Sequence, residues 1–217
     1  MKSTRHLLCS HKFKIPNSPS IQLNIRLIDI MESDSDIIVN PSNIGLLGST
    51  NKNYWMFTGR KNVDTAVHSK AGSLLQKECN KLSNLAQNPG DGVLTSSYKL
   101  EKNGTKKIAF VVTPRMTTIV QNALDNSQEG LLFQKQLKAC FKFPLQAADD
   151  YGYKSISMPA LSCGVGQCDP HISAKLMLET MLEYFKEKEN SSIRSITCCM
   201  IEKKTYSIFT KMANNIL

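Results

Sequence analysis

The chain has 217 residues, of which 27 are Lys or Arg and 18 are Asp or Glu, so its formal net charge is +9. With 41% hydrophobic and 21% charged residues, the composition is typical of a globular protein with one sizeable core, and it excludes fibrous and fully disordered classes. No apolar run approaches the ~18 residues that a membrane-spanning helix needs. The positive charge indicates an anionic partner, without distinguishing nucleic acid, nucleotide, acidic lipid and acidic protein.

Much of the charge is concentrated at the start of the chain. No acidic residue precedes Asp29, whereas four basic residues lie near the N-terminus: Lys2, Arg5, Lys12 and Lys14. We expect residues 1–20 to form a basic, flexible tail. An acid-free start with Arg and Ser is also compatible with an organellar transit peptide or a nucleic-acid-binding arm. Because no secretory hydrophobic segment is present, we expect a cytoplasmic or nuclear protein.

The seven cysteines are an odd number in a chain without a secretion signal, and we interpret them as reduced thiols. Cys163 and Cys168 have a C-x4-C spacing near His171, which raises the question of a metal. A structural zinc site needs a second pair of ligands at defined spacing, and the sequence has none there. We therefore expect no metal and no cofactor.

The first half of the chain contains two predicted strands. Ile21–Ile30 alternates and is rich in β-branched residues, and Asp36–Asn40 is a short apolar run typical of a buried parallel strand. We expect Pro41, which lacks an N–H group, to end this second strand. The segment from Ile44 to Asn62 has no clear period and is predicted to be a long loop.

Helices and strands then alternate. Asp64–Asn80 has helical spacing, with Asp64 as the predicted N-cap, and Leu131–Asp150 is a helix that Pro144 should kink or split. Three further buried strands are predicted at Lys107–Val112, Ser155–Leu161 and Ser195–Ile201.

A glycine-containing loop, SCGVGQC, follows the strand that begins at Ser155. Asp169 and Pro170 then give a strong start signal for an amphipathic helix, and Tyr206–Leu217 is predicted to be the closing helix. This alternation predicts an α/β fold with a largely parallel or mixed sheet, in a single domain over residues 21–217.

Ligands of such sheets bind beyond the carboxyl ends of the strands. The loop from Ser162 to Gly166 could present its amides to a phosphate, or be a structural turn. Asn43 could fix a sugar or base, or form an Asx turn. Asp64 and His68 share a helix face, which suits either a general base or a helix cap beside a surface histidine.

The ordered set VNPSN, VDTAVHSKAG, KIAFVVTP and MPALSCGVGQCDP resembles the macrodomain family, whose fold binds ADP-ribose. The resemblance extends over Ile21–Leu217. It implies a three-layer α/β/α sandwich with a mixed, largely parallel central sheet, and a cleft for ADP-ribose across the carboxyl edge of that sheet.

The resemblance also implies roles for single residues. Asp29, followed by Ile30, matches the acceptor of the adenine amine, and Asn43 matches the asparagine at the distal ribose. Asp64 and His68 match the pattern of the hydrolase branch, in which the Asp helps to activate a water at the ribose C1″. The diphosphate loop corresponds to five consecutive residues: Ser162, Cys163, Gly164, Val165 and Gly166.

The sequence departs from the family pattern in the first glycine loop. The usual short glycine run is replaced by an insertion between Gly48 and Asn62 that contains Trp55 and Phe57. The insertion either holds the loop too far from the ribose for catalysis or supplies a substitute wall of aromatic rings. After the last strand, the aromatic residue that commonly stacks on adenine is replaced by one of Met200, Ile201 or Glu202.

Three functions follow as hypotheses. The first is hydrolysis of mono-ADP-ribose from modified targets, and the second is a reader that binds ADP-ribose without turnover. The third is a nucleic-acid-binding protein that uses its basic tail and the lysines of residues 99–107, with a vestigial cleft. The expected partner is ADP-ribose or a mono-ADP-ribosylated protein, with weak nucleic-acid contact through the tail and no membrane.

Overall fold

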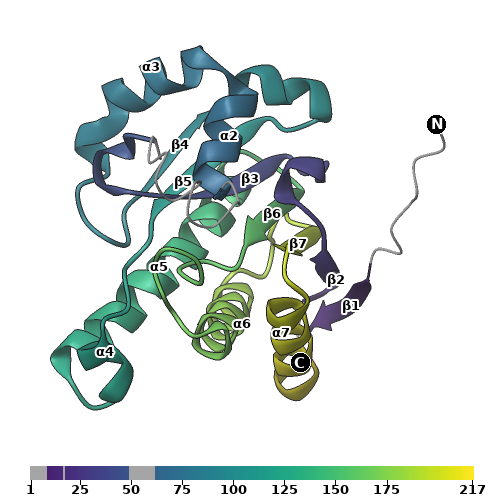
Figure 1. Ribbon diagram of the computed structural model, residues 1–217. Helices are drawn as coiled ribbons and strands as arrows, with labels where there is room; N and C mark the ends of the chain where they lie inside the picture. The colour runs from purple at the N-terminus through teal and green to yellow at the C-terminus, as the bar shows by residue number, and fades with distance from the viewer. Residues whose placement is uncertain (1–8, 17, 49–61) are drawn as a thin grey trace.

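The computed structural model describes residues 9–16, 18–48 and 62–217 of the chain. Residues 1–8 of the predicted tail and most of the Gly48–Asn62 insertion, including Trp55 and Phe57, lie outside this range. Within the described residues, seven strands form one mixed sheet in the order β1-β2-β7-β6-β3-β5-β4 (Figure 1).

Five neighbouring strands are parallel and the two edge strands are antiparallel to their neighbours. The parallel strands are β2 (Ser18–Leu27), β3 (Ile37–Ser42), β5 (Lys107–Val112), β6 (Ser155–Pro159) and β7 (Ser195–Met200). The edge strands are β1 (Ser10–Ile15) and β4 (Gly92–Ser96). All parallel strands therefore direct their carboxyl ends to the same edge of the sheet.

Helices cover both faces of the sheet, as Figure 1 shows. One face carries α2 (Val63–Ala71) and α3 (Ser73–Leu82). The other carries α5 (Gln128–Asp150), α6 (Pro170–Glu187) and α7 (Lys203–Ile216), and the short α4 (Thr118–Asn122) precedes α5. Four 3-10 turns complete the described elements: η1 (Ile30–Glu32), η2 (Ile44–Leu46), η3 (Ser83–Leu85) and η4 (Tyr98–Asn103).

The core consists of two clusters separated by the sheet. In β5, Ile108 and Phe110 pack toward α2 and α3, while Ala109 and Val111 pack toward α5 and α6. Because both faces of the strand are buried, its sequence is a continuous apolar run rather than an alternating one. The predicted three-layer α/β/α sandwich with a mixed, largely parallel sheet is thus confirmed.

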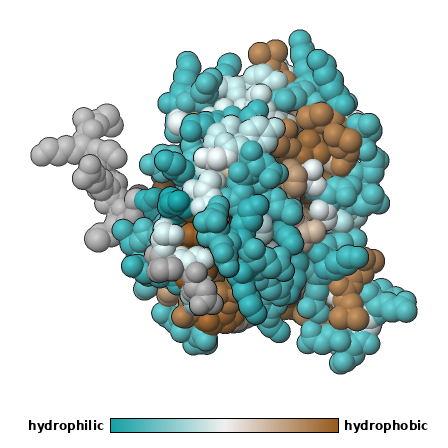
Figure 2. Space-filling view, turned by 180° about the vertical axis from the view of Figure 1, so that it is seen from behind, coloured by the Kyte–Doolittle hydropathy of each residue, from teal (hydrophilic) through white to brown (hydrophobic). Residues whose placement is uncertain are grey.

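Seen from behind, most of the molecule is covered by hydrophilic side chains, with apolar groups gathered in a few places (Figure 2). None of the described helices combines the length and hydropathy needed to cross a bilayer.

The predicted helix Asp64–Asn80 is wrong in two respects. Gly72 has a φ of 91° and divides it into α2 and α3, because this left-handed backbone is incompatible with a continuous helix. The N-cap of α2 is Asn62, whose side chain accepts a hydrogen bond from the N–H of Thr65 at 2.8 Å. Asp64 is therefore not the cap, and its carboxylate instead accepts a hydrogen bond from the side chain of Asn40.

The expectation that Pro41 ends its strand was also wrong. Strand β3 continues through Pro41 to Ser42, because at that point it pairs with β5 alone, and a missing N–H group is tolerated where one side is unpaired. Pro144 is buried within α5 and does not split that helix.

The sequence interpretation missed both edge strands. The predicted tail reached residue 20, but Ser10–Ile15 forms β1, which pairs antiparallel with β2. Its side chains are largely exposed, so it has no apolar pattern to reveal it. Strand β4 has only five residues and alternates between buried and half-buried positions.

Asp149, near the end of α5, connects this helix to α6 and to the segment before β7 through hydrogen bonds. Its carboxylate accepts hydrogen bonds from the Tyr184 hydroxyl at 2.6 Å, the Ser191 hydroxyl at 2.8 Å and the backbone N–H of Ser192 at 2.6 Å. Burial by itself would raise the pKa of this carboxyl, but these donors lower it below its ordinary value of 3.8.

We predict that Asp149→Asn lowers the free energy of unfolding by about 1–3 kcal/mol at neutral pH, because buried donors lose a charged acceptor. Since the folded pKa is depressed, the stabilisation is complete above pH 3.8 and is lost as the pH falls through the folded pKa. Urea unfolding from pH 7 to pH 3 measures both effects. The exposed neighbour Asp150, changed to Asn, is the control; an equal loss there would contradict the assignment.

Candidate functional site

A cleft of about 780 Å³ lies at the carboxyl ends of the parallel strands. It is lined by residues that follow β2, β3, β5, β6 and β7 and by one face of α2. Nine residues predicted from the sequence line it: Asp29, Ile30, Asn43, Asp64, Ser162, Cys163, Gly164, Val165 and Gly166. His68 does not line it but lies directly behind Asp64.

The loop after β6 presents unpaired amides to the cleft. The N–H groups of Gly164, Val165 and Gly166 take part in none of the hydrogen bonds among the described residues. The loop leads to α6, whose N-cap is Asp169 and whose first residue is Pro170, as predicted. Consecutive free amides near a helix N-terminus form an anion-binding concavity.

The two glycines of this loop have different steric roles. A Cβ at Gly166 would lie 2.6 Å from the carbonyl oxygen of Ser162, so a side chain there would displace the backbone. A Cβ at Gly164 would meet no atom within 4 Å. The loop conformation therefore requires Gly166, while Gly164 leaves space open above the amides.

At the β2 end of the cleft, Asp29 caps η1. Its Oδ1 accepts a hydrogen bond from the N–H of Met31 at 2.9 Å, while the residue itself stays exposed. Ile30 is buried beneath it. The residues after β7, which include Ile201 and Glu202, line the same end of the cleft.

Asn43 makes the Asx-type contact considered for it from the sequence, and it also lines the cleft. Its Oδ1 accepts a hydrogen bond from the N–H of Leu47 at 3.0 Å, which is an Asx-type contact. The residue is nevertheless exposed at the cleft. Its side-chain amide group thus remains as a donor toward the cavity.

Asp64 is a buried carboxylate at the floor of the cleft, 5% exposed. Its Oδ1 accepts a hydrogen bond from Nδ2 of Asn40 at 2.7 Å. Nε2 of His68 is 3.5 Å from the same oxygen, and among the described residues it has no hydrogen-bond partner. The His68 ring packs edge-on against Phe110. Asn40 therefore orients the carboxylate, and His68 lies behind it.

Sequence reasoning missed three residues of the site. Asn40, fully buried, was assigned only to the end of a strand. Arg115 and Lys70 line the cleft with exposed cationic side chains. Arg115 follows β5, and the rule that ligands bind beyond the carboxyl ends of parallel strands would have indicated it.

The cysteines of this loop are not activated as nucleophiles. Burial raises the pKa of the Cys163 thiol to about 12, so at neutral pH it is a protonated, weakly nucleophilic group. His171 pairs instead with Asp169, with Nδ1 and Oδ1 2.9 Å apart. In the described parts of the chain, no group of three or more His, Cys, Asp or Glu side chains is placed to hold a metal.

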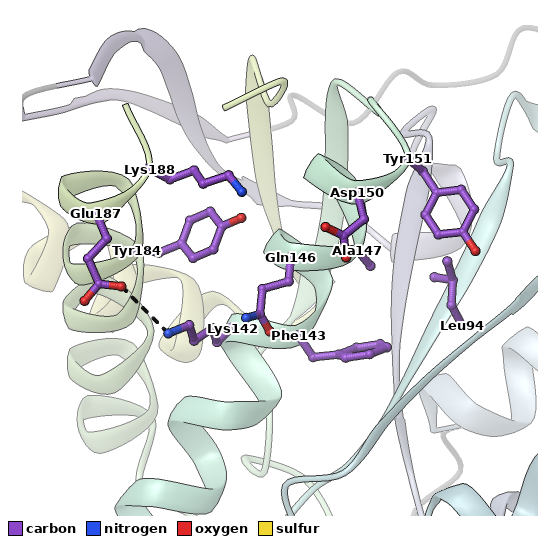
Figure 3. Close-up of a pocket in the computed structure, with 10 residues that line it drawn as sticks. All are labelled: Leu94, Lys142, Phe143, Gln146, Ala147, Asp150, Tyr151, Tyr184, Glu187 and Lys188. Carbon is purple, nitrogen blue, oxygen red and sulfur yellow. Dashed lines mark ion pairs between the residues drawn. The ribbon is translucent and has the colours of Figure 1, made fainter. Parts of the chain in front are cut away.

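A second hollow, of about 550 Å³, lies between the last turns of α5 and α6 and strand β4 (Figure 3). Two of its charged residues pair with each other, since Nζ of Lys142 lies 3.9 Å from the carboxylate of Glu187, and the hydroxyl of Tyr184 donates to Asp149. It contains none of the residues that the sequence motifs indicate. The cleft at the carboxyl edge is therefore the candidate site.

The family model described as Macro domain matches residues 39–177. This chain belongs to the macro domain family. The matched region includes most of β3, all of α2 and β5 and the loop Ser162–Gly166, and it extends into α6.

Curated relatives agree with this assignment. A macro domain-containing protein of Listeria monocytogenes is 29% identical over 189 residues, which cover 86% of this chain and 94% of the relative. The rat ADP-ribose glycohydrolase MACROD1 is 26% identical over 192 residues, covering 88% of this chain and 65% of the relative.

Solved structures share the fold. The Oceanobacillus iheyensis macrodomain with ADP superposes with a TM-score of 0.76 at 24% identity, covering 97% of each chain. The Trypanosoma brucei macrodomain in complex with ADP-ribose gives 0.68 at 20% identity, covering 87% of this chain and 68% of the other.

We predict that Gly166→Ala destabilises this macro domain by about 1–3 kcal/mol, because its Cβ would collide with backbone. The matched control, Gly164→Ala, places its Cβ in open space and should leave stability within about 0.5 kcal/mol of the parent. Thermal unfolding compares the two. Equal effects would show that the loop does not have the described conformation.

Proposed function

We propose that this macro domain binds ADP-ribose in the cleft and hydrolyses mono-ADP-ribose from modified targets. The observation that carries the proposal is the run of three unpaired amides, Gly164 to Gly166, in a cleft that also contains Asp29, Asn43 and the buried carboxylate of Asp64. Macro domain relatives that include a protein named an ADP-ribose glycohydrolase support it.

In this proposal the diphosphate sits on the loop Ser162–Gly166. Backbone N–H groups bind phosphate oxygens without a counter-charge, and the dipole of α6 adds to the attraction. Asp29, exposed at the β2 end, would accept a hydrogen bond from the amino group of adenine. Asn43, at the end of β3, would donate its amide hydrogens to the hydroxyl groups of the distal ribose.

Asp64 would act on the reacting carbon. A water held by its carboxylate attacks C1″ of the distal ribose. A bond forms between the water oxygen and C1″, and the bond between C1″ and the ester oxygen of the target's acidic residue breaks. Asp64 accepts one proton from the attacking water and passes it to the departing carboxylate, so the products are ADP-ribose and the free carboxylic acid of the target. Asn40 keeps Asp64 oriented through the 2.7 Å hydrogen bond, and His68 supports it from behind.

We predict that Gly164→Glu abolishes ADP-ribose binding, because the new carboxylate would face the diphosphate and cover the amides. Its Cβ enters open space, so the variant should fold. Isothermal titration with ADP-ribose measures the effect, and Gly164→Ala, which adds no charge, should bind like the parent. Undiminished affinity of the Glu variant would mean that the diphosphate lies elsewhere.

We predict that Asp64→Asn lowers turnover of a substrate mono-ADP-ribosylated on an acidic residue by roughly 10²–10⁴-fold, the usual contribution of a general base. ADP-ribose affinity should change little, because Asp64 acts on the water. Release assays and titrations give the two values, and thermal unfolding checks that both proteins are folded.

Other outcomes would redirect the proposal. Binding of ADP-ribose without any release by the parent protein would leave the reader function. Salt-sensitive binding to plain DNA or RNA that survives Gly164→Glu, with no ADP-ribose binding at millimolar concentration, would favour the nucleic-acid hypothesis.

A further inference from the structure

The edge of the sheet opposite the cleft carries a pair of stacked tyrosines. The rings of Tyr151 and Tyr153 have centroids 5.7 Å apart and an interplanar angle of 10°. Both residues lie between α5 and β6, so they stand at the amino edge of the sheet, where the parallel strands begin. Tyr153 is half-buried and packs against the core, whereas Tyr151 is 59% exposed. One ring is thus anchored in the protein, and the other is presented to solvent.

The end of α5 fixes the position of this pair. The N–H of Tyr153 donates to the carbonyl oxygen of Ala148 at 2.8 Å, and the N–H of Gly152 donates to that of Asp149 at 3.2 Å. Gly152 itself has a left-handed φ of 68°. These features form a Schellman motif, a common glycine-dependent end of a helix. Because the backbone of the turn is held by hydrogen bonds, little freedom is lost when a ligand stacks on the exposed ring.

Two lysines at the start of β5 flank the rings. Nζ of Lys106 lies 5.3 Å from the centre of the Tyr153 ring, and Nζ of Lys107 lies 5.8 Å from the centre of the Tyr151 ring. Lys106 also forms an ion pair with Asp36 at 2.8 Å. The ion pairs among the described residues do not include Lys107. An uncompensated positive charge therefore lies beside the exposed ring.

The register of the sheet adds two cations to the same edge. Ser155 pairs with Ser195, and the N–H of Arg194 donates to the carbonyl oxygen of Lys154 at 2.8 Å, so Lys154 and Arg194 are neighbours. Both are exposed, and neither takes part in the ion pairs of the described parts of the chain. In the strand order, β3 separates β6 from β5. With roughly 4.8 Å between strands, Arg194, Lys154 and Lys107 form a row of cations roughly 14 Å long.

Tyr151 also lines the second hollow, of about 550 Å³. In Figure 3, Tyr151, Leu94 and Phe143 lie on one side of this hollow, and Lys142 and Lys188 project from the other. The hollow has the size of a small-molecule site, and its aromatic wall continues the exposed ring of Tyr151. A flat heterocyclic group can therefore stack on Tyr151 and enter the hollow.

Polar groups of the hollow suit the edge of a base better than a phosphate. Asp150 and Gln146 line it and are exposed, and a carboxylate and an amide both form hydrogen bonds with base edges. Because Asp150 and Glu187 repel phosphates, we expect a phosphate chain to follow the cations at the amino edge, with a base in the hollow.

We propose that this surface, defined by Tyr151, Lys107, Lys154 and Arg194, binds single-stranded nucleic acid. An exposed aromatic ring beside a row of cations provides the two contacts by which proteins bind single strands, stacking on the bases and attraction of the backbone. In a duplex the base faces are covered by their neighbours, so a duplex gains only the second contact. The inference is independent of the proposed function, because the surface and the cleft lie at opposite edges of the sheet.

The test measures fluorescence anisotropy of a labelled strand of about 12 nucleotides, a length within the usual range for one single-strand site. The probes are single-stranded DNA, single-stranded RNA and the corresponding duplex DNA. The variants are Tyr151→Ala, Tyr151→Phe and the double variant Lys107→Gln/Lys154→Gln. The matched control, Lys81→Gln/Lys211→Gln, removes the same charge from exposed residues of α3 and α7. Thermal unfolding checks that every variant is folded.

We expect single strands to bind more tightly than the duplex. Tyr151→Ala should weaken single-strand binding roughly tenfold through lost stacking, and Tyr151→Phe should bind like the parent. The double variant Lys107→Gln/Lys154→Gln should lower the slope of log affinity against log salt by roughly 1.4, about 0.7 for each phosphate contact. The control should change neither value, and excess ADP-ribose should not displace the strand.

Several results would overturn the inference. Absence of submillimolar single-strand binding at low salt would remove it outright, and unchanged binding by Tyr151→Ala would exclude stacking on that ring. An equal loss in the control would assign binding to overall charge, and displacement by ADP-ribose would place the strand in the cleft. If a polyglutamate peptide competes as well as unlabelled single strand does, the partner is an acidic protein instead.

Discussion

The parallel alignment of β2, β7, β6, β3 and β5 is the constraint on which the site depends. Each of these strands ends at the same edge of the sheet, so five connections from distant parts of the sequence converge there. Helices cover both faces of the sheet. The backbone groups of these five connections therefore remain accessible at the carboxyl edge. The loop Ser162–Gly166, Asp29, Asn43 and Arg115 meet in one cleft for this reason.

Capping chemistry determines what Asp64 can do. Because Asn62 satisfies the first turn of α2, the carboxylate of Asp64 is released from that task and turns into the floor of the cleft. A buried carboxylate is tolerated only when hydrogen bonds compensate for its lost hydration, and Asn40 supplies one at 2.7 Å. Asn40 belongs to the sheet and Asp64 to the helix that covers it. The packing of α2 on β3 therefore sets the geometry of the Asp64 carboxylate.

The sequence predicted the fold where its signals were strong. The buried runs of β3, β5, β6 and β7 and the Asp169-Pro170 start of α6 are local features, and each was found close to its observed position. Strand β1 could not be found, because an exposed edge strand has no burial pattern, and its pairing with β2 is a tertiary contact. The break at Gly72 was missed because the apolar spacing continues through it on both sides.

The residues that line the cleft were largely predictable from the sequence, but the hydrogen bonds that join them were not. Asn43, Asp64 and the loop Ser162–Gly166 followed from motif order, and they do share one cleft. The hydrogen bond from Asn40 to Asp64 joins residues 24 positions apart, and no local pattern encodes it. The contacts that hold Arg115 against Ser162 and Gly166 likewise depend on how three strands are ordered in the sheet.

Part of the positive charge has a use unrelated to any ligand. Strand β1 forms an edge of the sheet, and its exposed residues include Lys12 and Lys14. A free strand edge invites pairing with the edge of another molecule, and lysines placed along it make such pairing unfavourable, because like charges on two edges would be brought together. Lys12 and Lys14 on β1 therefore disfavour pairing between the edges of two molecules.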